Sequence, residues 1–458
     1  MSQLSAVVLA AGQGKRMHSK HSKVLHQVCG RPMIDWVLQA AEGAGAVRSI
    51  VVVGHAREEL QAYLQDRVQY AVQEQQLGTG HAVLQAEELL KHENGTVMVL
   101  VGDTPLLTAQ TLQKAYAFHC SSQACATVLA ASVDQPKGYG RVVCRDGQVE
   151  KIVEDKDASP EELEIRLINA GMYFFDCQDL FSTLAQVGNA NAQGEYYLTD
   201  VCAILKKMGK GVACYQMEDA DEIQGVNDRT QLSEMEKLMN LRTIRALQKS
   251  GVTIADPTCT YIEPGVKIGM DTVILPGCHL SGTTVIGEDC VIGPQTNLSN
   301  MTVGDRVTMK YTVGMDSTVG EDTTVGPFAY IRPNSKIGKK VKIGDFVEVK
   351  NSTIDTGTKV SHLTYIGDSD VGAGVNFGCG TVTVNYDGTH KFRTTIGDKA
   401  FIGCNTNLVA PVTVAPEAFI AAGSTITEDI PDDCLAIARA RQTNIKGWVS
   451  KRKEKNSK

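Results

Sequence analysis

The chain of 458 residues has a formal net charge of −7, with 43% hydrophobic and 21% charged residues. This length exceeds the roughly 250–300 residues at which a single hydrophobic core stops growing, so at least two domains are expected. The negative charge argues against a nucleic-acid-binding surface, and no run of about 18 apolar residues could cross a membrane. Thirteen cysteines, scattered singly and without a C-x-x-C pair, argue against a disulfide framework or a thiolate zinc site. We therefore expect a cytoplasmic protein with reduced thiols that binds neither nucleic acid nor membranes.

The first apolar run follows no basic segment and leads directly into a glycine turn, which predicts a strand and not a signal peptide. Up to about Asn227, strand-like and helix-like segments alternate along the chain. Such alternation is typical of βαβ units around a mostly parallel sheet. We expect an α/β, Rossmann-like domain over residues 1–229, with elements at Ala6–Leu9, Pro32–Ala44, Ile50–Val53, Glu58–Gln65 and Val97–Val101.

The turn after the first strand contains Gly12 and Gly14, where backbone N–H groups can approach a triphosphate closely. Arg16 and Lys23 would neutralise the phosphate charge, and we expect both to act in catalysis. A Walker A loop requires G-x-x-x-x-G-K-[ST], which is absent, and a dinucleotide-binding loop requires a third glycine where Met17 stands. The pattern therefore favours another kind of nucleotide-binding loop, with a plain tight turn as the alternative.

The second half of the chain has a different period. Residues 230–250 contain neither Gly nor Pro and show apolar residues at helical spacing, which predicts a linker helix. After Gly251, aliphatic residues recur every six positions, as in hexapeptide repeats that build a parallel β-helix with three short strands per triangular coil. We expect this β-helix over residues 251–458. The period is visible at Ile262, Ile268, Ile274, Leu280, Ile286 and Ile292, and again at Val414, Ile420 and Ile426.

The hexapeptide pattern is expected to break over His362–Arg393, where polar and aromatic residues replace the regular ladder. A solenoid can be only a scaffold, because a fold does not determine a function. Loops on a rigid repeat, however, are where binding sites are usually found. We therefore expect a second site in this segment.

Motifs from both halves occur in the order found in one enzyme family. They are Leu9–Met17, Ser22–Leu25, Gln76–Ala82, Gly102–Leu106, Gly138–Arg141, Ile152–Glu154, Ile168–Gly171, Gln193–Asp200, Gly225–Asn227, Ile331–Pro333, Val347–Lys350 and Ser361–Asp368. Over nearly its full length, the chain resembles the bacterial bifunctional UDP-N-acetylglucosamine pyrophosphorylases/glucosamine-1-phosphate N-acetyltransferases. The resemblance implies acetyl transfer from acetyl-CoA to glucosamine 1-phosphate, then uridylyl transfer from UTP to N-acetylglucosamine 1-phosphate. It also implies Mg²⁺, a left-handed β-helix, a homotrimer with the acetyl site between subunits, and a role in supplying peptidoglycan and lipopolysaccharide precursors.

Phosphoryl transfer requires positioning and charge neutralisation more than a protein nucleophile. Asp103 directly follows the predicted strand Val97–Val101 and is the hard oxygen ligand expected for Mg²⁺, and the resemblance adds Asn227 as a second ligand. By the same resemblance Gln73, Gly78 and Thr79 would read the uracil. The remaining contacts implied for UTP and the sugar are Leu9, Ala10, Ala11, Gly12, Lys23, Gly140, Glu154, Asn169 and Asn227.

Acetyl transfer to an amine requires a general base and stabilisation of an oxyanion. His362 lies in a segment similar to the family's catalytic segment, so we expect it to be the base. The resemblance implies that Arg332, Lys350, Tyr365 and Asn376 hold the sugar phosphate. It implies acetyl-CoA contacts from Cys379, Asn385, Tyr386, Lys391, Cys404, Ala422 and Arg439. Cys379 and Cys404 depart from the family, which typically has alanine and serine there, so side-chain hydrogen bonds cannot be transferred to them.

Two other functions compete with this interpretation. A nucleotidyltransferase with a regulatory or oligomerising β-helix would not need His362 or the Asn385-Tyr386 pair. A structural protein that uses the solenoid for docking would not need the polar motifs of the first half. Both alternatives predict no acetyl-CoA-dependent release of a thiol in the presence of glucosamine 1-phosphate.

Overall fold

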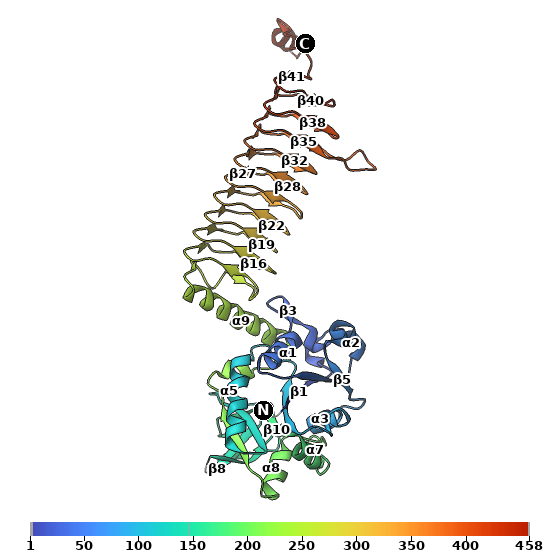
Figure 1. The fold of residues 1–458 in the computed structure, drawn as a ribbon, viewed down its shortest axis with the longest axis vertical. Helices are drawn as coiled ribbons and strands as arrows, with labels where there is room; N and C mark the ends of the chain where they lie inside the picture. Colours follow the sequence, from blue (N-terminus) through green and yellow to red (C-terminus); the bar gives the residue numbers. More distant parts are fainter. Residues whose placement is uncertain (1–2, 146, 457–458) are drawn as a thin grey trace. The chain divides into compact units, whose positions relative to one another are not determined.

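The computed structural model describes residues 3–145 and 147–456. The chain divides into two compact units between Met239 and Asn240, coloured blue to green and green to red in Figure 1. Among the described residues, no helix is both long and apolar enough to span a membrane.

The first unit is built on a nine-stranded sheet with the order β5-β4-β1-β6-β10-β7-β11-β9-β8. Strands β9 and β10 run against the other seven, so the predicted, mostly parallel α/β fold is confirmed. The strands are β1 Gln3–Ala10, β4 Arg48–Val53, β5 Gln69–Val72, β6 Gly95–Val101, β7 Ala126–Ser132, β8 Arg141–Arg145, β9 Gln148–Val153, β10 Leu167–Asp176 and β11 Val212–Gln216, and β2 Gln27–Val28 pairs with β3 Arg31–Pro32.

Helices cover both faces of this sheet (Figure 1) because successive strand residues point to opposite sides and both sides are apolar. On β1, Val7 belongs to one buried cluster while Ala6 and Val8 belong to the other. Helices α1 Met33–Gly43 and α5 Ala109–Ser122 contribute to the second cluster. The first cluster includes residues of α3 Thr79–Leu84, α7 Cys177–Leu184 and α8 Asp200–Lys207. The short helices α2 Arg57–Leu64, α4 Glu87–Leu90 and α6 Pro160–Leu163 complete the unit.

The predicted linker helix is present as α9 Arg229–Lys249. Its first half places Met235 and Met239 in a buried cluster of the first unit. In its second half, Ile244 is fully buried in the core of the second unit. Asn240 Nδ2 donates to the Thr260 carbonyl at 2.8 Å, and Ile262 N donates to Asn240 Oδ1 at 2.9 Å. These contacts cover the first coil of the β-helix.

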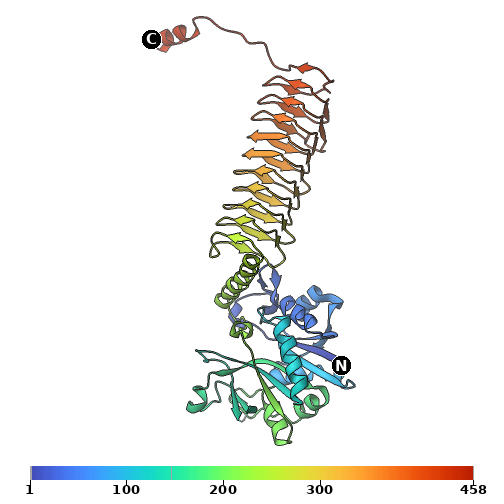
Figure 2. The same ribbon diagram turned by 60° about the vertical axis from the view of Figure 1, so that its left-hand side comes forward.

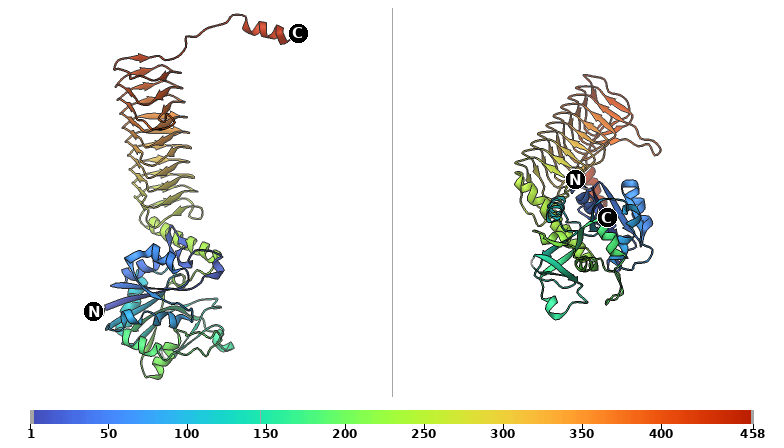
Figure 3. Two further views of the ribbon diagram at one scale, coloured as in Figure 1. Left: turned by 90° about the vertical axis from the view of Figure 1, so that its right-hand side faces the viewer. Right: turned by 60° about the horizontal axis from the view of Figure 1, so that its bottom comes forward.

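The second unit is a stack of triangular coils, seen from the side in Figure 2 and in the left view of Figure 3. Three parallel sheets of eleven, ten and nine short strands form its faces, from β12 Thr253–Ile254 to β41 Leu435–Ala436. We call them the eleven-, ten- and nine-stranded faces. On most strands one aliphatic residue points into a single continuous core, as predicted for hexapeptide repeats of the left-handed parallel β-helix. Phe377 takes this position in β33, Gly314 in β22 and Thr383 in β34. The C-terminal helix α10 Trp448–Asn456 is exposed.

The strands that carry the second site occupy the middle and last coils. On the eleven-stranded face they are β27 Lys342–Asp345, β30 Lys359–His362, β33 Asn376–Phe377, β36 Phe401–Ile402 and β39 Phe419–Ile420. On the ten-stranded face they are β25 Tyr330–Ile331, β28 Glu348–Lys350, β31 Tyr365–Gly367 and β34 Val382–Val384. On the nine-stranded face they are β29 Thr353–Ile354, β32 Ser369–Val371 and β35 Thr394–Ile396.

The expectation that His362–Arg393 breaks the repeat is wrong for most of that segment. Strands β31 to β34 continue the three faces. The residues of this region that point inward are all buried, namely Val349, Ile354, Val360, Ile366, Val371 and Phe377. The repeat units that end at Ile354 and at Val371 are five residues long instead of six, and this hides the six-residue period in the sequence. Only the loop between β34 and β35 leaves the ladder, and it protrudes from the stack in Figure 1.

Candidate active sites

A cavity of about 260 Å³ lies at the carboxyl ends of β1 and β6 in the first unit, the edge where ligands bind in open α/β sheets. It brings together most of the residues expected to contact UTP and adds Val24, Gln76, Ala82, Val101 and Glu195. The expected residues among its lining are Leu9, Ala10, Ala11, Gly12, Lys23, Gln73, Gly78, Thr79 and Asp103.

One wall of this cavity is the turn around Gly78. A Cβ atom there would lie 2.6 Å from the Tyr196 carbonyl oxygen, and the φ of 114° is unfavourable for other residues. Tyr196 N donates to the Leu77 carbonyl at 2.8 Å, which fixes the predicted Gln193–Asp200 motif against the turn. Gln73 is 3% exposed and donates through Nε2 to the Gly78 carbonyl at 3.1 Å. Glycine at this position therefore permits a close backbone approach that shapes the cavity.

Lys23, Asp103 and Asn227 converge beside this cavity. The Lys23 ammonium forms an ion pair with Asp103 Oδ2 and donates to Asn227 Oδ1 at 3.3 Å. Val226 N donates to the Asp103 carbonyl at 3.0 Å, and this bond holds the two segments together. Carboxylate and amide oxygens are hard ligands suited to Mg²⁺. Here the Asp103 carboxylate and the Asn227 amide oxygen both contact the Lys23 ammonium. The residues therefore fit the expected metal.

Gly140, Glu154 and Asn169 form a second group in the first unit. A Cβ atom on Gly140 would lie 3.4 Å from Glu154 Oε2 and 3.6 Å from Asn169 Cβ. Asn169 N donates to the Gly140 carbonyl at 2.8 Å. Burial raises the pKa of the Glu154 carboxyl above its ordinary value. These three residues can therefore act together on one ligand.

Arg16, unlike the cavity residues, Asn227 and the group around Gly140, is an expected site residue that the structure places outside these clusters. Its side chain is exposed and is not part of the cavity lining. Three further residues of the cavity lining, Gln76, Ala82 and Glu195, were not predicted individually as site residues. They lie within the motifs Gln76–Ala82 and Gln193–Asp200, which were the signal in the sequence that could have identified them. Val24 lies in the Ser22–Leu25 motif, and Val101 ends the predicted strand Val97–Val101, but neither apolar side chain was itself singled out.

In the second unit, His362 ends β30 and lies beside Asp345, which ends β27 on the preceding coil. His362 Nδ1 is 2.6 Å from Asp345 Oδ1, and the two side chains are 57% and 38% exposed. The hydrogen bond from His362 holds the pKa of Asp345 below its ordinary value. Because Nδ1 is occupied by this carboxylate, Nε2 is the nitrogen available as a base. Asp345 was not predicted, since it stands 17 positions away in the sequence.

The ten-stranded face carries three of the four residues expected to hold a sugar phosphate, Arg332, Lys350 and Tyr365. Arg332 Nη1 donates to Glu348 Oε1 at 2.8 Å, and Glu348 pairs with Tyr365 on the next coil. Lys350 Nζ lies 3.4 Å from Asp368 Oδ2, and Asn385 donates to the same carboxylate. Neither Glu348 nor Asp368 was predicted as a site residue, although both lie in quoted segments.

Three cations gather around this face. Contact with the Lys350 amine and repulsion by its charge lower the pKa of Lys391, and Arg332 adds to that repulsion. Burial opposes ionisation of Asp368, yet hydrogen bonds from Asn351 and Asn385 and the charge of Lys350 keep its pKa below the ordinary value. Mutual repulsion of cations is relieved by an anion, so this cluster suits a phosphate group.

Four of the seven residues expected to contact acetyl-CoA, Cys379, Cys404, Ala422 and Arg439, form a column at the corner that follows the eleven-stranded face. Asn405 N donates to the Cys379 carbonyl at 2.7 Å, and Gly423 N donates to the Cys404 carbonyl at 2.8 Å. Cys379, Cys404 and Ala422 therefore follow one another on successive coils. A Cβ atom on Gly423 would lie 3.8 Å from Arg439 Cδ, which places Arg439 next in this column.

The structure does not bring all acetyl-site residues onto one face. Asn376 lies on the eleven-stranded face, whereas Lys350 and Tyr365 lie on the ten-stranded face. Tyr386 is 55% exposed on the protruding loop, where it pairs with Lys391. Two faces of a triangular prism point in different directions from the corner that they share. One chain therefore does not enclose a ligand between Asn376 on one face and Lys350 and Tyr365 on the other.

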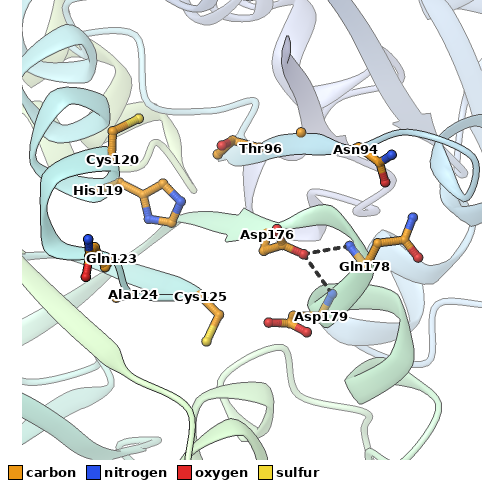
Figure 4. Close-up of a pocket in the computed structure, with 11 residues that line it drawn as sticks. Asn94, Thr96, His119, Cys120, Gln123, Ala124, Cys125, Asp176, Gln178 and Asp179 are labelled. Atoms are coloured by element: carbon orange, nitrogen blue, oxygen red, sulfur yellow. Dashed lines mark hydrogen bonds between the residues drawn. The ribbon is translucent and has the colours of Figure 1, made fainter. Parts of the chain in front are cut away.

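A larger hollow of about 640 Å³ lies at the opposite edge of the first unit's sheet, near the start of β6 and the end of β10 (Figure 4). Its polar groups are used by the fold itself. Asp176 accepts hydrogen bonds from the backbone of Gln178 and Asp179 to cap α7, and Asp179 pairs with Lys210. His119 contacts Thr127 Oγ1 at 2.8 Å, and burial lowers its pKa to about 4. We assign no ligand to this hollow.

The fold and the two sites define a transferase with a nucleotidyltransferase unit and a hexapeptide-repeat unit. Residues 5–227 match the Nucleotidyl transferase family, and residues 265–300 and 316–351 match the Bacterial transferase hexapeptide family. The solved structure of a UDP-glucose pyrophosphorylase complexed with UDP-glucose covers 52% of the chain and 98% of that protein, with 19% identity and a TM-score of 0.43.

Curated relatives match over almost the whole chain. The bifunctional protein GlmU of Caldanaerobacter subterraneus is 54% identical over 99% of both chains. That of Halalkalibacterium halodurans is 53% identical over 99% of this chain and 100% of its own, and that of Brevibacillus brevis is 54% identical over 100% of both. The chain belongs to the GlmU family. It is a bifunctional enzyme of UDP-N-acetylglucosamine synthesis, an acetyltransferase and uridylyltransferase that uses acetyl-CoA and UTP.

Proposed function

We propose that the β-helix unit acetylates glucosamine 1-phosphate and that the first unit then transfers a uridylyl group from UTP to the product. The observation that carries this assignment is the Asp345–His362 pair. It provides an oriented base beside a column of coenzyme-contacting residues, which a purely regulatory β-helix would not need. The UDP-N-acetylglucosamine formed would supply peptidoglycan and lipopolysaccharide synthesis.

In the first unit, the backbone of Leu9–Gly12 would hold the triphosphate of UTP, and Gln73, Gly78 and Thr79 would read the uracil. Gly140, Glu154 and Asn169 would position N-acetylglucosamine 1-phosphate so that its phosphate oxygen attacks the α-phosphorus. Lys23 and Arg16 would neutralise charge on the nucleotide, Arg16 by reaching in from the surface.

Asp103 and Asn227 would hold Mg²⁺, which when bound supplies neutralisation of the charge that develops on the phosphates. The convergence of their oxygens on the Lys23 ammonium supports this assignment. Lys23 would then turn from these oxygens towards the phosphates.

In the second unit, Arg332, Lys350 and Lys391 would bind the phosphate of glucosamine 1-phosphate, while Tyr365, Asn376 and Asn385 orient the sugar. The thioester of acetyl-CoA would lie along the column of Cys379, Cys404, Ala422 and Arg439, with Tyr386 at the loop. His362 Nε2 would take a proton from the amine as its nitrogen bonds to the carbonyl carbon. The C–S bond then breaks, and coenzyme A leaves as a thiol after it receives a proton.

We propose that the active form is a homotrimer in which the eleven-stranded face of one subunit meets the ten-stranded face of another. The division of Asn376 from Lys350 and Tyr365 between two faces supports this arrangement. A strip of exposed apolar side chains along the shared corner supports it as well, because such strips mark interfaces. The strip comprises Tyr311, Phe328, Phe346 and Leu363, which are 37%, 54%, 56% and 58% exposed.

The subunits are proposed to act in the cytoplasm, where UTP and acetyl-CoA are available. In the part of the chain that the structure describes no disulfide joins two cysteines, which is the state expected in a reducing compartment. The proposal involves no nucleic acid and no membrane as a partner.

The test is to measure both half-reactions with the full chain. Glucosamine 1-phosphate and acetyl-CoA should release a free thiol, and N-acetylglucosamine 1-phosphate and UTP should release pyrophosphate only while a divalent cation is present. If no thiol were released while pyrophosphate release was normal, the protein would instead be a nucleotidyltransferase with a regulatory β-helix. For the trimer, His362→Ala and Lys350→Ala subunits should restore acetyl transfer when they are mixed after dissociation. Failure to complement in a verified mixed trimer would overturn the shared site.

A further inference from the structure

Two cysteines of the second unit are direct neighbours on adjacent coils. Phe377 of β33 pairs with Ile402 of β36, and Gly378 N donates to the Ile402 carbonyl at 2.7 Å. The next bond of the ladder runs from Asn405 N to the Cys379 carbonyl, also at 2.7 Å. Cys379 and Cys404 are therefore in register across a parallel ladder, in which neighbouring strands lie about 4.8 Å apart.

Their backbones also have the same local conformation. Each cysteine directly precedes a corner residue with positive φ, which is Gly380 at 76° after Cys379 and Asn405 at 54° after Cys404. Equivalent conformations on stacked coils make the two Cβ atoms leave the corner in the same direction. The ladder supplies a Cα separation within the range of about 4.4–6.8 Å found for disulfides. A small tilt of the two Cα–Cβ bonds towards each other would bring the Cβ atoms from about 4.8 Å into the range of about 3.5–4.5 Å that the bond also requires.

Both thiols are free and at least partly open to solvent, Cys404 being the more exposed of the two. The buried cysteines Cys278 and Cys290 of the same unit instead belong to the core. A small reagent can therefore reach both thiols, and each thiol has the other as its neighbour one coil away.

We propose that Cys379 and Cys404 form a reversible disulfide by exchange with a low-molecular-weight disulfide. The thiolate of one cysteine attacks a sulfur of the reagent, which gives a mixed disulfide and releases one small thiol. The second cysteine then attacks the protein sulfur of that mixed disulfide, closes the Cys379–Cys404 bond and releases the second small thiol. Two protein thiols lose two electrons and two protons, and the reagent disulfide gains them.

This bond would control acetyl transfer, a consequence that rests on the function proposed above. The two cysteines lie in the corner column between His362 and Ala422, where acetyl-CoA is expected to bind. Joining the sulfurs removes both thiols from the coenzyme's path and ties the two coils together. Uridylyl transfer takes place on the other unit and should be unaffected.

The experiment exposes the reduced full-length enzyme to coenzyme A disulfide or to glutathione disulfide and digests it with trypsin under non-reducing conditions. Cys379 lies on the peptide 360–391 and Cys404 on the peptide 400–439, which also contains Cys434. Cys434→Ser is therefore the background, and Cys120→Ser and Cys144→Ser are matched controls for exposed thiols in the other unit. The two activities are measured before oxidation, after oxidation and after dithiothreitol.

The expected result is a joined pair of peptides two hydrogen masses lighter than their sum, with loss of at least about nine-tenths of acetyl transfer and full recovery on reduction. Cys379→Ala should abolish the joined pair, and saturating acetyl-CoA should delay it. Free or singly modified peptides at equilibrium with the reagent would overturn the proposal. A joined pair with normal acetyl transfer would uphold the disulfide and overturn the proposed coenzyme position. A reduced enzyme without acetyl transfer would overturn the proposed function while the peptide masses still decide the disulfide.

Discussion

His362→Ala is expected to reduce acetyl transfer by about 10²–10³-fold and to leave uridylyl transfer unchanged. Loss of a general base typically costs about 10²–10⁴-fold. We expect the lower part of this range because His362 is 57% exposed in the single chain, so water that stays in the shared site beside Nε2 can accept the proton instead. The side chain is not part of the hydrophobic core, so the variant should fold normally.

The assay is the initial rate of thiol release from acetyl-CoA between pH 6 and 9, with pyrophosphate release from UTP as the internal control. His279→Ala is the matched control, since His279 is an exposed histidine on β16 His279–Ser281 of the same unit, and the centre of its ring lies 6.2 Å from that of Tyr261. It should retain both activities.

A rate within about threefold of the parent would refute the role of His362, since even a weak general base contributes about 10²-fold. Equal loss of both activities in a folded variant would refute the independence of the two sites. A rate restored by added imidazole would identify the missing group as a proton acceptor.

Four further variants test the remaining assignments. Asp103→Ala should abolish pyrophosphate release while thiol release stays near the parent rate, and comparable loss of both in a folded protein would contradict two separate sites. Asp345→Asn should slow acetyl transfer by less than about tenfold, because exposed charge pairs are weak, and an effect as large as that of His362→Ala would mean that the carboxylate does more than orient the ring. A fragment from Gly251 should fold and acetylate but should be about 2–4 kcal/mol less stable than one from Arg229, since it lacks the buried Ile244; equal melting temperatures would show that α9 adds nothing. Burial raises the pKa of Glu154, so its neutral form stabilises the folded state below the unfolded pKa of about 4.3, and this contribution is lost as pH rises through the folded value; Glu154→Gln should therefore melt higher than the parent at pH 7–8 but not below pH 4, and should raise the KM for N-acetylglucosamine 1-phosphate.

Much of the first site could be predicted because its residues lie in local motifs at strand ends. The glycine turn after β1 and Asp103 after β6 meet at one edge simply because β1 and β6 are parallel neighbours. Arg16 was expected in the same cavity but is exposed. A position close to the glycine turn in the sequence does not determine the direction in which a long side chain points. The Lys23 contact with both Asp103 and Asn227 joins positions 80 and 204 residues apart, and no local pattern indicates it.

By itself, the sequence determined the two fold classes. Aliphatic residues that recur every six positions are buried together when the repeats stack into a β-helix, and alternating strands and helices form a sheet that is covered by helices. The sequence also determined the candidate base, through the residues around His362. Only the tertiary structure decided which side chains are neighbours in the β-helix. Coils of unequal length place Asp345 against His362 across 17 residues and Cys379 against Cys404 across a longer coil that carries the protruding loop. The physical reason is that contacts between coils depend on the summed length of every turn and insertion between them, whereas the six-residue period reports only which residues point inward.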